Sequence, residues 1–336
     1  MPPDLRERFR FTQGQYLTLR THLGDEEVRR SYSICSAISD PYLRVAVKRV
    51  ADGRFSSWAH ENLQPGHVID VAPPEGRFHV PLERESRRHY LGFAAGSGIT
   101  PLLSIVKTTL EQEPQSRFTL VYGNRSSSTV MFRQELLELK DRYLGRLAIL
   151  FVMSREPQDV ELFHGRIDRA KCDELFARLI DVGSVDVTFV CGPEAMTHDV
   201  VASLGAHGMD TGRVKTELFL AAAGRGPSAR PKAVEVVHGT TSATVTMDGQ
   251  TRAFTIERGG ETVLEAGLRQ GLDLPYSCKG GVCSTCRAVL KRGEVDMDHN
   301  YVLEDYEIAR GFILMCQSHP VTSELQIDLD AVPSHG

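Results

Sequence analysis

Four cysteines near the C-terminus constrain this chain more than any other feature. Cys278, Cys283 and Cys286 give the spacing C-x4-C-x2-C, and Cys316 follows after 29 intervening residues. This is the ligand spacing of plant-type [2Fe–2S] clusters, in which three thiolates come from one loop and a fourth from a distant segment. Zinc is the alternative, but zinc sites usually combine two C-x2-C pairs and this chain has one. The spacing therefore predicts a plant-type [2Fe–2S] cluster on these four thiols.

The residues around the cysteines predict a small β-grasp domain. Asp248-Gly249 is a hairpin signal between two alternating segments, and Gly271 is placed to end a helix. Upstream, residues 221–231 are small, rich in Gly and Pro and without pattern, which predicts a linker. The expected elements are strands over 243–247, 251–256, 287–290 and 325–329 and a helix over 262–270.

Length and composition limit the remaining possibilities. A chain of 336 residues is too long for one ordinary core, so two or three domains are expected. Seven cysteines without a secretory signal argue against a disulfide framework. A net charge of −5 argues against a nucleic-acid partner, and no apolar run is long enough to cross a membrane. A cytoplasmic location is expected.

The charge is unevenly distributed along the chain. From Ala233 onwards there are 8 Lys+Arg and 15 Asp+Glu, a net charge of −7, whereas the first 232 residues carry +2. An acidic domain either attracts a basic docking partner or is simply kept in solution by its charge. The acidic residues between the third and fourth cysteine ligands are candidates for a docking face: Asp296, Asp298, Glu304, Asp305 and Glu307.

A nicotinamide-binding fold is predicted for the middle of the chain. The apolar run 89–95 is followed by Gly96-Ser97-Gly98-Ile99-Thr100-Pro101 and a helical pattern to Leu110. A strand, a glycine turn and a helix N-terminus form the arrangement that receives a pyrophosphate on free backbone N–H groups. A purely structural strand–helix turn is the alternative, because the third glycine of the dinucleotide fingerprint is missing. Further strands are expected over 118–122, 147–153 and 185–190 and a helix over 132–143.

Two of these strands end in residues that can bind a nucleotide. Gly123-Asn124-Arg125-Ser126 follows one, and an arginine with hydroxyl neighbours there would bind a 2′-phosphate, which favours NADPH over NADH. Cys191-Gly192-Pro193 follows the other. Alternation of strands and helices predicts a parallel, doubly wound sheet whose ligand lies at the carboxyl ends of the strands.

The first eighty residues predict a flavin-binding half. Short strands over 15–20, 30–35, 43–49 and 67–72, separated by turn residues, favour an antiparallel barrel. On the second strand, Arg30 could neutralise a phosphate, Tyr32 could stack on a flat ring, and Ser33 could reach a ring nitrogen. The segment 53–58 reads as a loop that enters a helix and offers N–H groups to a phosphate.

These motifs occur in the order found in the ferredoxin–NADP reductase superfamily, in its branch with a fused C-terminal ferredoxin, which the chain resembles over almost its whole length. The segments that carry the resemblance are RSYS, GRFSSW, GSGITP, YGNR, CGPEAM and the four-cysteine pattern. Within that branch it is most similar to the reductase subunits of phenylacetyl-CoA epoxidases, and the reductases of ketosteroid 9α-hydroxylases share most of these motifs. Members carry about one more strand before the segment matching Phe9, so either the barrel lacks its first strand or the sequence begins late.

The resemblance implies roles for particular residues. Ser33, Cys191, Glu217 and Phe219 would form the catalytic centre between flavin and nicotinamide. The implied cofactor-binding residues are Arg30, Tyr32, Ser33, Lys48, Gly53, Phe55 and Ser56 for FAD, and Gly96, Gly98, Thr100, Arg125, Cys191, Gly192 and Pro193 for the nicotinamide nucleotide.

The expected organisation is therefore a multidomain α/β and β protein. An FAD-binding β-barrel would occupy residues 1–84, a doubly wound NAD(P)-binding domain 85–221, a linker 222–232 and a [2Fe–2S] ferredoxin domain 233–336. Electrons would pass from NADPH, or NADH, through FAD and the cluster to a partner oxygenase docked on the ferredoxin domain. The preferred client is a phenylacetyl-CoA epoxidase; a steroid or ring-hydroxylating oxygenase, or a non-catalytic redox-sensing role, is the alternative. The isolated chain is expected to be a monomer.

Overall fold

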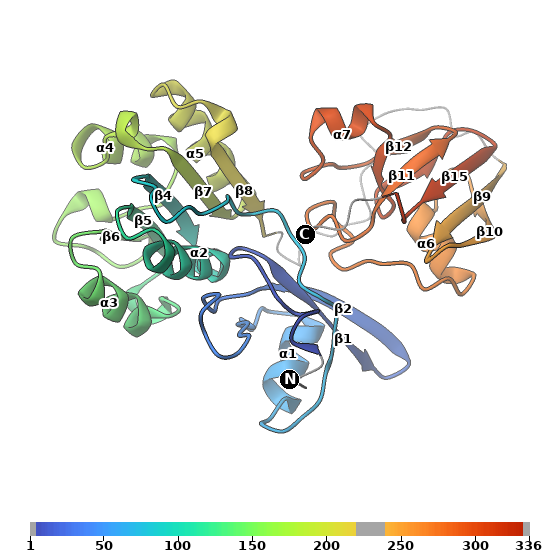
Figure 1. The fold of residues 1–336 in the computed structure, drawn as a ribbon, viewed down its shortest axis with the longest axis horizontal. Helices are drawn as coiled ribbons and strands as arrows, with labels where there is room; N and C mark the ends of the chain where they lie inside the picture. The colour runs from blue at the N-terminus through green and yellow to red at the C-terminus, as the bar shows by residue number, and fades with distance from the viewer. Residues whose placement is uncertain (1–4, 220–238, 332–336) are drawn as a thin grey trace. The chain divides into compact units, whose positions relative to one another are not determined.

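The structure, a computed structural model, describes residues 5–219 and 239–331 (Figure 1). The described residues divide into two compact units. One contains the chain up to Leu17, Tyr32–His67 and the chain from Ala72 to the gap; the other contains Thr18–Ser31, Val68–Val71 and the chain after the gap. The predicted linker at 222–232 lies outside the described residues. Among the described residues no helix is long and apolar enough to cross a membrane.

A five-stranded parallel sheet forms the centre of the first unit. Its strand order, β6-β5-β4-β7-β8, has the crossovers expected of a doubly wound domain. Large apolar side chains from both faces, including Tyr90 and Phe118 on one and Phe93 and Val190 on the other, are fully or almost fully buried. The strands are β4 (His89–Ala95), β5 (Arg117–Asn124), β6 (Leu147–Met153), β7 (Val187–Gly192) and β8 (Val214–Leu218).

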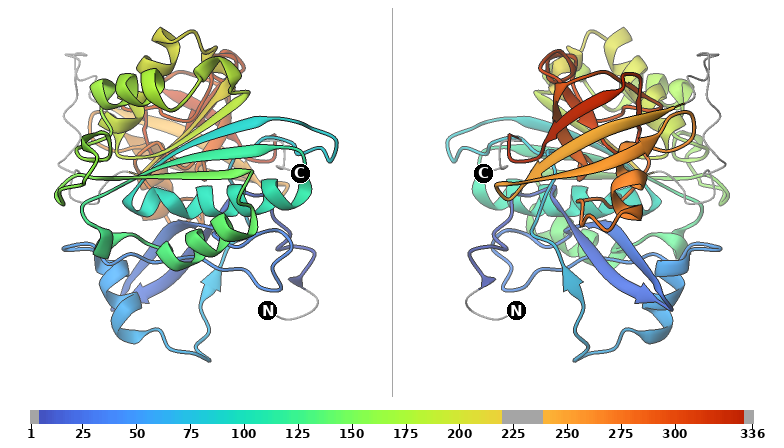
Figure 2. Two further views of the ribbon diagram at one scale, coloured as in Figure 1. Left: turned by 90° about the vertical axis from the view of Figure 1, so that its left-hand side faces the viewer. Right: turned by 90° about the vertical axis from the view of Figure 1, so that its right-hand side faces the viewer.

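Helices cover both faces of this sheet, as the two side views show (Figure 2). α2 and α3 pack into the core on one face, and α4 and α5 into the core on the other. The α-helices are α2 (Ile99–Gln112), α3 (Arg133–Arg142), α4 (Arg169–Arg178) and α5 (Glu194–Ala206). The short 3-10 helices are η2 (Gly96–Gly98), η3 (Ser127–Thr129), η4 (Glu161–Phe163), η5 (Val182–Ser184) and η6 (Thr211–Arg213).

The N-terminal half is a β domain with fewer regular strands than expected. Its three-stranded sheet has the order β2-β1-β3, from β1 (Tyr16–Leu23), β2 (Glu26–Ser33) and β3 (Asp70–Val71), and α1 (Arg54–Asn62) follows the predicted loop. The strand predicted over 43–49 is wrong: it contributes an isolated bridge between Ile34 and Val45 and one bond from Cys35 N–H to the Arg44 carbonyl. The strand predicted over 67–72 is only two residues long.

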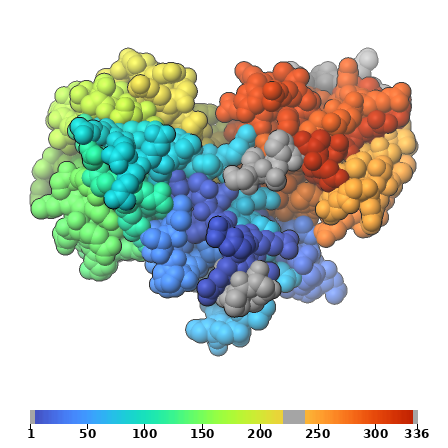
Figure 3. All heavy atoms as spheres, in the orientation of Figure 1, coloured from blue at the N-terminus to red at the C-terminus, as the bar shows by residue number. Residues whose placement is uncertain are grey.

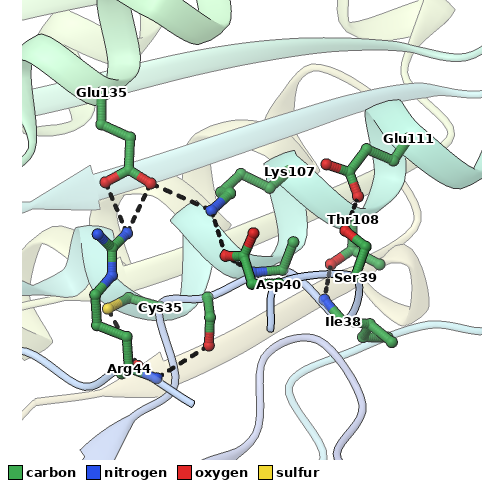
Figure 4. A network of polar contacts seen from close by, with 11 residues as sticks. Cys35, Ile38, Ser39, Asp40, Arg44, Lys107, Thr108, Glu111 and Glu135 are labelled. Carbon is green, nitrogen blue, oxygen red and sulfur yellow. Dashed lines mark hydrogen bonds and ion pairs between the residues drawn. The ribbon is translucent and has the colours of Figure 1, made fainter. Parts of the chain in front are cut away.

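A polar network joins residues of this β domain to helices α2 and α3 (Figure 4). Arg44 donates to both oxygens of Glu135 at 2.6 and 2.7 Å, and Lys107 bridges Glu135 and Asp40 at 3.3 and 2.6 Å. Burial opposes ionisation of Asp40, but its bonds from Lys107 and the Ala37 N–H outweigh that effect and lower its pKa. The network makes the flavin-side segment and the nicotinamide-side helices parts of one unit.

The second unit contains the predicted β-grasp elements. Its five-stranded sheet has the order β10-β9-β15-β11-β13, and β12 pairs with β14. Asp248 and Gly249 both have positive φ, at 52° and 71°, as the confirmed hairpin turn requires. A capping box between Thr262 and Glu265 begins the predicted helix. The elements are β9 (Thr240–Met247), β10 (Gln250–Glu257), α6 (Val263–Arg269), β11 (Arg287–Arg292), β12 (Val295–Met297), α7 (Asp305–Ala309), β13 (Phe312–Leu314), β14 (Ser318–Pro320) and β15 (Glu324–Asp328).

Candidate functional site

The carboxyl ends of β7 and β8 bring two of the four predicted catalytic residues together. In the parallel pairing of these strands Cys191 lies opposite Glu217, and the Cys191 Sγ is 4.0 Å from Glu217 Oε2. Phe219 follows β8, and its N–H donates to the Gly192 carbonyl at 3.3 Å. The register of the two strands therefore fixes Cys191, Glu217 and Phe219 at one edge of the sheet.

Ser33, the fourth predicted catalytic residue, reaches the same carboxyl group from β2. Burial raises the pKa of Glu217 to about 8, although a hydrogen bond with Ser33 lowers it. Burial, and then the charge of Glu217, raises the pKa of the Cys191 thiol. At neutral pH the carboxyl group is therefore protonated and the thiol is neutral. The carboxyl group of Glu217 can therefore hold and release a proton close to physiological pH.

The glycine turn after β4 lies against the same residues. Gly96 has φ +54°, and a Cβ on Gly98 would collide with the carbonyl oxygen of Cys191. Thr100 is buried, and its hydroxyl donates to the Ser97 carbonyl at 2.9 Å, which closes the turn into α2. The turn thus keeps backbone N–H groups of a helix start beside Cys191, with no side chain in between. Pro193, which is exposed, is the N-cap of α5 on the other side.

The predicted flavin-side residues fall into a packed group and an exposed group. Phe55 is 2% exposed, and its ring lies 5.5 Å from that of Tyr32. Ser56 is buried, donates to the Gly53 carbonyl at 3.1 Å and accepts from the Val50 N–H at 3.3 Å. The side chains of Phe55 and Ser56 therefore shape the loop, which leaves its backbone to meet a ligand.

The two predicted cations of the flavin-side segment, Lys48 and Arg30, lie in different surroundings. Lys48 is exposed. Its Nζ lies 3.4 Å from the position that a Cβ on Gly96 would occupy. Arg30 on β2 is partly buried and donates to the Arg29 carbonyl at 2.7 Å. Lys48 thus lies at the glycine turn, where it can meet a phosphate.

The predicted 2′-phosphate site lies at the carboxyl end of β5. Arg125 is exposed, and its carbonyl accepts from the Arg155 N–H at 2.9 Å. The preceding Asn124 is 8% exposed, and its Nδ2 has no partner in the described structure. Glu156 was not predicted from the sequence as a residue of this site. Its Oε2 accepts from both the N–H and the hydroxyl of Ser127, at 2.7 and 3.0 Å. The site therefore combines a cation with a carboxylate.

The four predicted cluster ligands converge in the second unit. Hydrogen bonds from Cys283 and Cys316, and from the N–H groups of Gly280 and Val282, lower the pKa of Cys278, whereas the same contact with Cys278 raises the pKa of Cys316. The Gly280 N–H is 3.3 Å from the Cys278 Sγ. No group of described His, Cys, Asp and Glu side chains is arranged to hold a single metal ion.

Strand pairing brings the two ligand segments together. Arg287 pairs with Leu314 between β11 and β13, and the Met315 N–H donates to the Cys286 carbonyl at 3.1 Å. Met315 therefore lies opposite Cys286, and Cys316 is the next residue after Met315. Gln317, missed from the sequence although it adjoins a ligand, donates to the Cys316 Sγ at 3.4 Å.

Two of the five acidic docking candidates are wrong. Glu307 is buried at 3% exposure and forms an ion pair with Arg287, and Asp298 is largely covered and paired with His319 at 3.0 Å. Both carboxylates serve the fold, because Glu307 pairs with Arg287 and Asp298 pairs with His319. The three exposed candidates are Asp296, Glu304 and Asp305. The last two belong to the surface around α7, in the orange-red part of Figure 3.

The residues present fit the cofactors that the sequence implies. Four converging thiols, three of them buried, with N–H donors aimed at them, suit the cluster. The close approach of Gly98 to the Cys191 carbonyl and the unpaired Asn124 amide suit a nucleotide at the strand ends. Ser33 and the protonated Glu217 suit a flavin ring that exchanges hydride and protons.

Comparison with known families matches all three parts of the chain. An oxidoreductase FAD-binding domain matches residues 3–80, an oxidoreductase NAD-binding domain matches 93–202, and a 2Fe-2S iron-sulfur cluster binding domain matches 245–321. These ranges contain the flavin loop, the glycine turn with Cys191, and the four cysteines respectively.

Two curated relatives and one solved structure match nearly the whole length of the chain. The chain is 45% identical to one of the subunits of the 1,2-phenylacetyl-CoA epoxidase of Escherichia coli (strain K12), over 98% of this chain and 92% of that protein. It is 34% identical to the ferredoxin reductase component of 3-ketosteroid-9-alpha-monooxygenase from Rhodococcus rhodochrous, over 98% and 90%. Its fold resembles that of phthalate dioxygenase reductase, with a TM-score of 0.55 and 24% identity over 95% of this chain and 88% of that chain.

Proposed function

The chain belongs to the family of FAD-, NAD- and [2Fe–2S]-binding oxidoreductases that are reductase components of multicomponent oxygenases, and we propose that it supplies electrons to a phenylacetyl-CoA ring epoxidase. One observation carries the reductase chemistry: Ser33, Glu217 and Cys191 meet beside the glycine turn, while a separate domain gathers four thiols. The client rests on the 45% identity to a component of such an epoxidase over nearly the whole chain.

The order of the cofactors follows from their electron count. A nicotinamide gives up two electrons as hydride, a [2Fe–2S] cluster takes one at a time, and a flavin does both. The flavin therefore has to act between the other two.

The residues at the strand ends prepare the site for hydride transfer. The protonated Glu217 holds the Ser33 hydroxyl by a hydrogen bond and keeps a proton available at the edge of the sheet. Burial keeps the Cys191 thiol neutral, and Gly98 packs directly against the Cys191 backbone, so neither residue places a charge below a flat ring bound at this edge. Phe219, whose N–H is bonded to the Gly192 carbonyl, packs partly buried against the core at the end of β8.

NADPH is the proposed donor, and Arg125 is its 2′-phosphate ligand. An exposed guanidinium at the end of β5 supports this assignment. Glu156 favours the second candidate, NADH, because its carboxylate already binds Ser127 and would repel a phosphate.

The exposed acidic residues Asp296, Glu304 and Asp305 are the proposed docking face for the oxygenase. Their negative charge suits a basic surface on the partner, and α7 is connected to the third cluster ligand through Arg287 and Glu307. We further propose that the isolated chain is a monomer, which sedimentation equilibrium would test.

Reconstitution tests the client directly. The purified reductase is mixed with the epoxidase components that act on phenylacetyl-CoA, or with a ketosteroid 9α-monooxygenase oxygenase, and product is measured per NADPH consumed. With the epoxidase components we expect product formation coupled to NADPH consumption. With the steroid oxygenase we expect NADPH oxidation without product. The reverse pattern would make the steroid enzyme the client. NADPH-dependent ferricyanide reduction in the absence of any oxygenase verifies the reductase itself.

A further inference from the structure

A buried ion pair lies directly behind the third cluster ligand. Arg287 follows Cys286, and its Nη1 donates to Glu307 Oε1 at 2.6 Å. The two side chains are only 5% and 4% exposed. The guanidinium also lies over the ring of Phe312, 5.1 Å from its centroid. Arg287 follows the third ligand in the sequence, and its side chain contacts Glu307 and Phe312, which precede the fourth ligand.

Glu307 uses its second oxygen to hold a helix. Glu307 Oε2 accepts from the Glu304 N–H at 3.1 Å, in the capping box that begins α7. One carboxylate therefore connects α7 to the strand that leaves Cys286. Because α7 is followed at once by β13, the same connection fixes the start of the strand that leads to Cys316.

Stability alone does not explain an ion pair at this position. Two buried charges lose their hydration, and well-packed apolar side chains of similar volume are often at least as stabilising. The ion pair differs from an apolar pair in one respect. It contains a buried cation whose charge is cancelled only while its carboxylate partner is present. In a poorly polarisable interior, a lone charge this close to the ligands would act strongly on a neighbouring group that changes its own charge.

We propose that Arg287 and Glu307 form a positioning pair in which Glu307 neutralises the buried Arg287 cation and so prevents it from shifting the one-electron reduction potential of the [2Fe–2S] cluster. Arg287 places a cation next to the ligand loop, and Glu307 neutralises it while holding α7 and β13 in place. Net charge near a cluster is one of the properties that set its potential. The inference is independent of which oxygenase is the client.

Three variants of the full-length holoprotein test the pair, with the midpoint potential measured by dye-mediated titration and the reduced cluster followed by EPR. Glu307→Gln removes the carboxylate and leaves the Arg287 charge in place, because an arginine side chain does not lose its proton. It is expected to raise the potential. Arg287→Gln combined with Glu307→Gln removes both charges and is expected to return the potential to the wild-type value. Glu324→Gln is the matched control. It removes the same charge from an exposed ion pair with Arg292, which lies on β11 as Arg287 does, and it is expected to leave the potential unchanged.

The comparison between single and double variants decides the question. If the pair had a purely structural role, the single and the double variant would shift the midpoint potential in the same way, because both lose the same hydrogen bond. An unchanged potential in Glu307→Gln, or an equal shift in the double variant, overturns the proposal. If Glu307→Gln does not assemble a cluster, iron and sulfide content becomes the readout. The charge-neutral double variant must then assemble it, and equal failure of both variants overturns the proposal as well.

Discussion

The two proposed redox sites of this molecule are built in opposite ways. At the flavin–nicotinamide site, Ser33, Cys191 and Glu217 come from three strands that are far apart in the sequence, and the register of β7 and β8 brings two of them together. At the cluster, Cys278, Cys283 and Cys286 come from one loop of nine residues, and strand pairing is needed only for the fourth ligand. The first site is therefore a property of the fold, and the second is largely a property of the local chain.

Removing one ligand should separate the two sites most completely. Cys286→Ser is expected to reduce cytochrome c reduction to background while NADPH–ferricyanide activity stays near the wild-type value, because a small oxidant can take electrons from the flavin directly. Cys172→Ala, a buried cysteine of the first unit, is the control and should leave both activities unchanged. Loss of both activities with FAD still bound would contradict the linear order of cofactors.

Glu217→Gln tests the site made by strand register. Loss of this proton-holding group should lower NADPH–ferricyanide turnover on the order of 100-fold, the lower end of what a positioned acid–base group contributes. Wild-type turnover should fall as the pH rises through about 8, where Glu217 ionises. The variant should show no such fall. A decline shared by both proteins would assign the titration to another group.

The same group gives a pH dependence of stability with a definite sign. The folded-state pKa of Glu217, about 8, lies above its ordinary value of 4.5, so between these values the folded protein keeps a proton that the unfolded chain has lost. Its stabilising contribution is complete below about pH 4.5 and is lost as the pH rises through about 8. Glu217→Gln should therefore gain melting temperature relative to wild type between pH 6 and pH 9. Parallel curves would contradict the raised pKa.

Arg125→Ala tests the nucleotide end of the first site. A guanidinium–phosphate bond contributes about 1.5–3 kcal/mol, so the KM for NADPH should rise roughly tenfold to a hundredfold while that for NADH hardly changes. Glu156→Gln should act in the opposite direction and lower the KM for NADPH. Arg142→Ala, on the last turn of α3, is the control. Equal effects of Arg125→Ala on both nucleotides would mean that the residue serves the pyrophosphate or the fold.

Charge reversal on the second unit should have a smaller effect that salt removes. Glu304→Lys with Asp305→Lys is expected to raise the KM for the oxygenase component several-fold at low salt, and the difference should shrink above about 0.15 M, where screening acts within about 8 Å. Glu257→Lys with Glu324→Lys makes the same change of charge elsewhere on the domain. Equal effects of the two pairs would show steering by net charge instead of a docking face on α7.

The opposite constructions also explain what could be read from the sequence. The cluster ligands were predictable because their spacing alone encodes the loop, and the hairpin at Asp248-Gly249 because its turn needs two positive φ values. The resemblance supplied Ser33, Cys191 and Glu217, but their mutual contact depends on strand pairing that no local pattern encodes.

The wrong predictions have the same origin. Glu307 and Asp298 look like surface charges until Arg287 and His319 are known to lie beneath them. The segment 43–49 has a strand-like composition, but it forms only an isolated bridge at residues 34 and 35, which includes the bond from the Cys35 N–H to the Arg44 carbonyl. Glu156 was missed because its role depends on Ser127, which follows a different strand.

The hydrogen bond from the Met315 N–H to the Cys286 carbonyl has a consequence for how the protein is made in the cell. Cys286 and Cys316 belong to the apolar core of the second unit, and the Met315 carbonyl also accepts from the Leu264 N–H at the start of α6. The ligands can therefore be gathered only after β13 has left the ribosome and paired with β11. Since binding of iron and sulfide is then coupled to completion of this core, iron starvation should leave newly synthesised chains with a finished first unit and an unfinished second one, exposed to proteases.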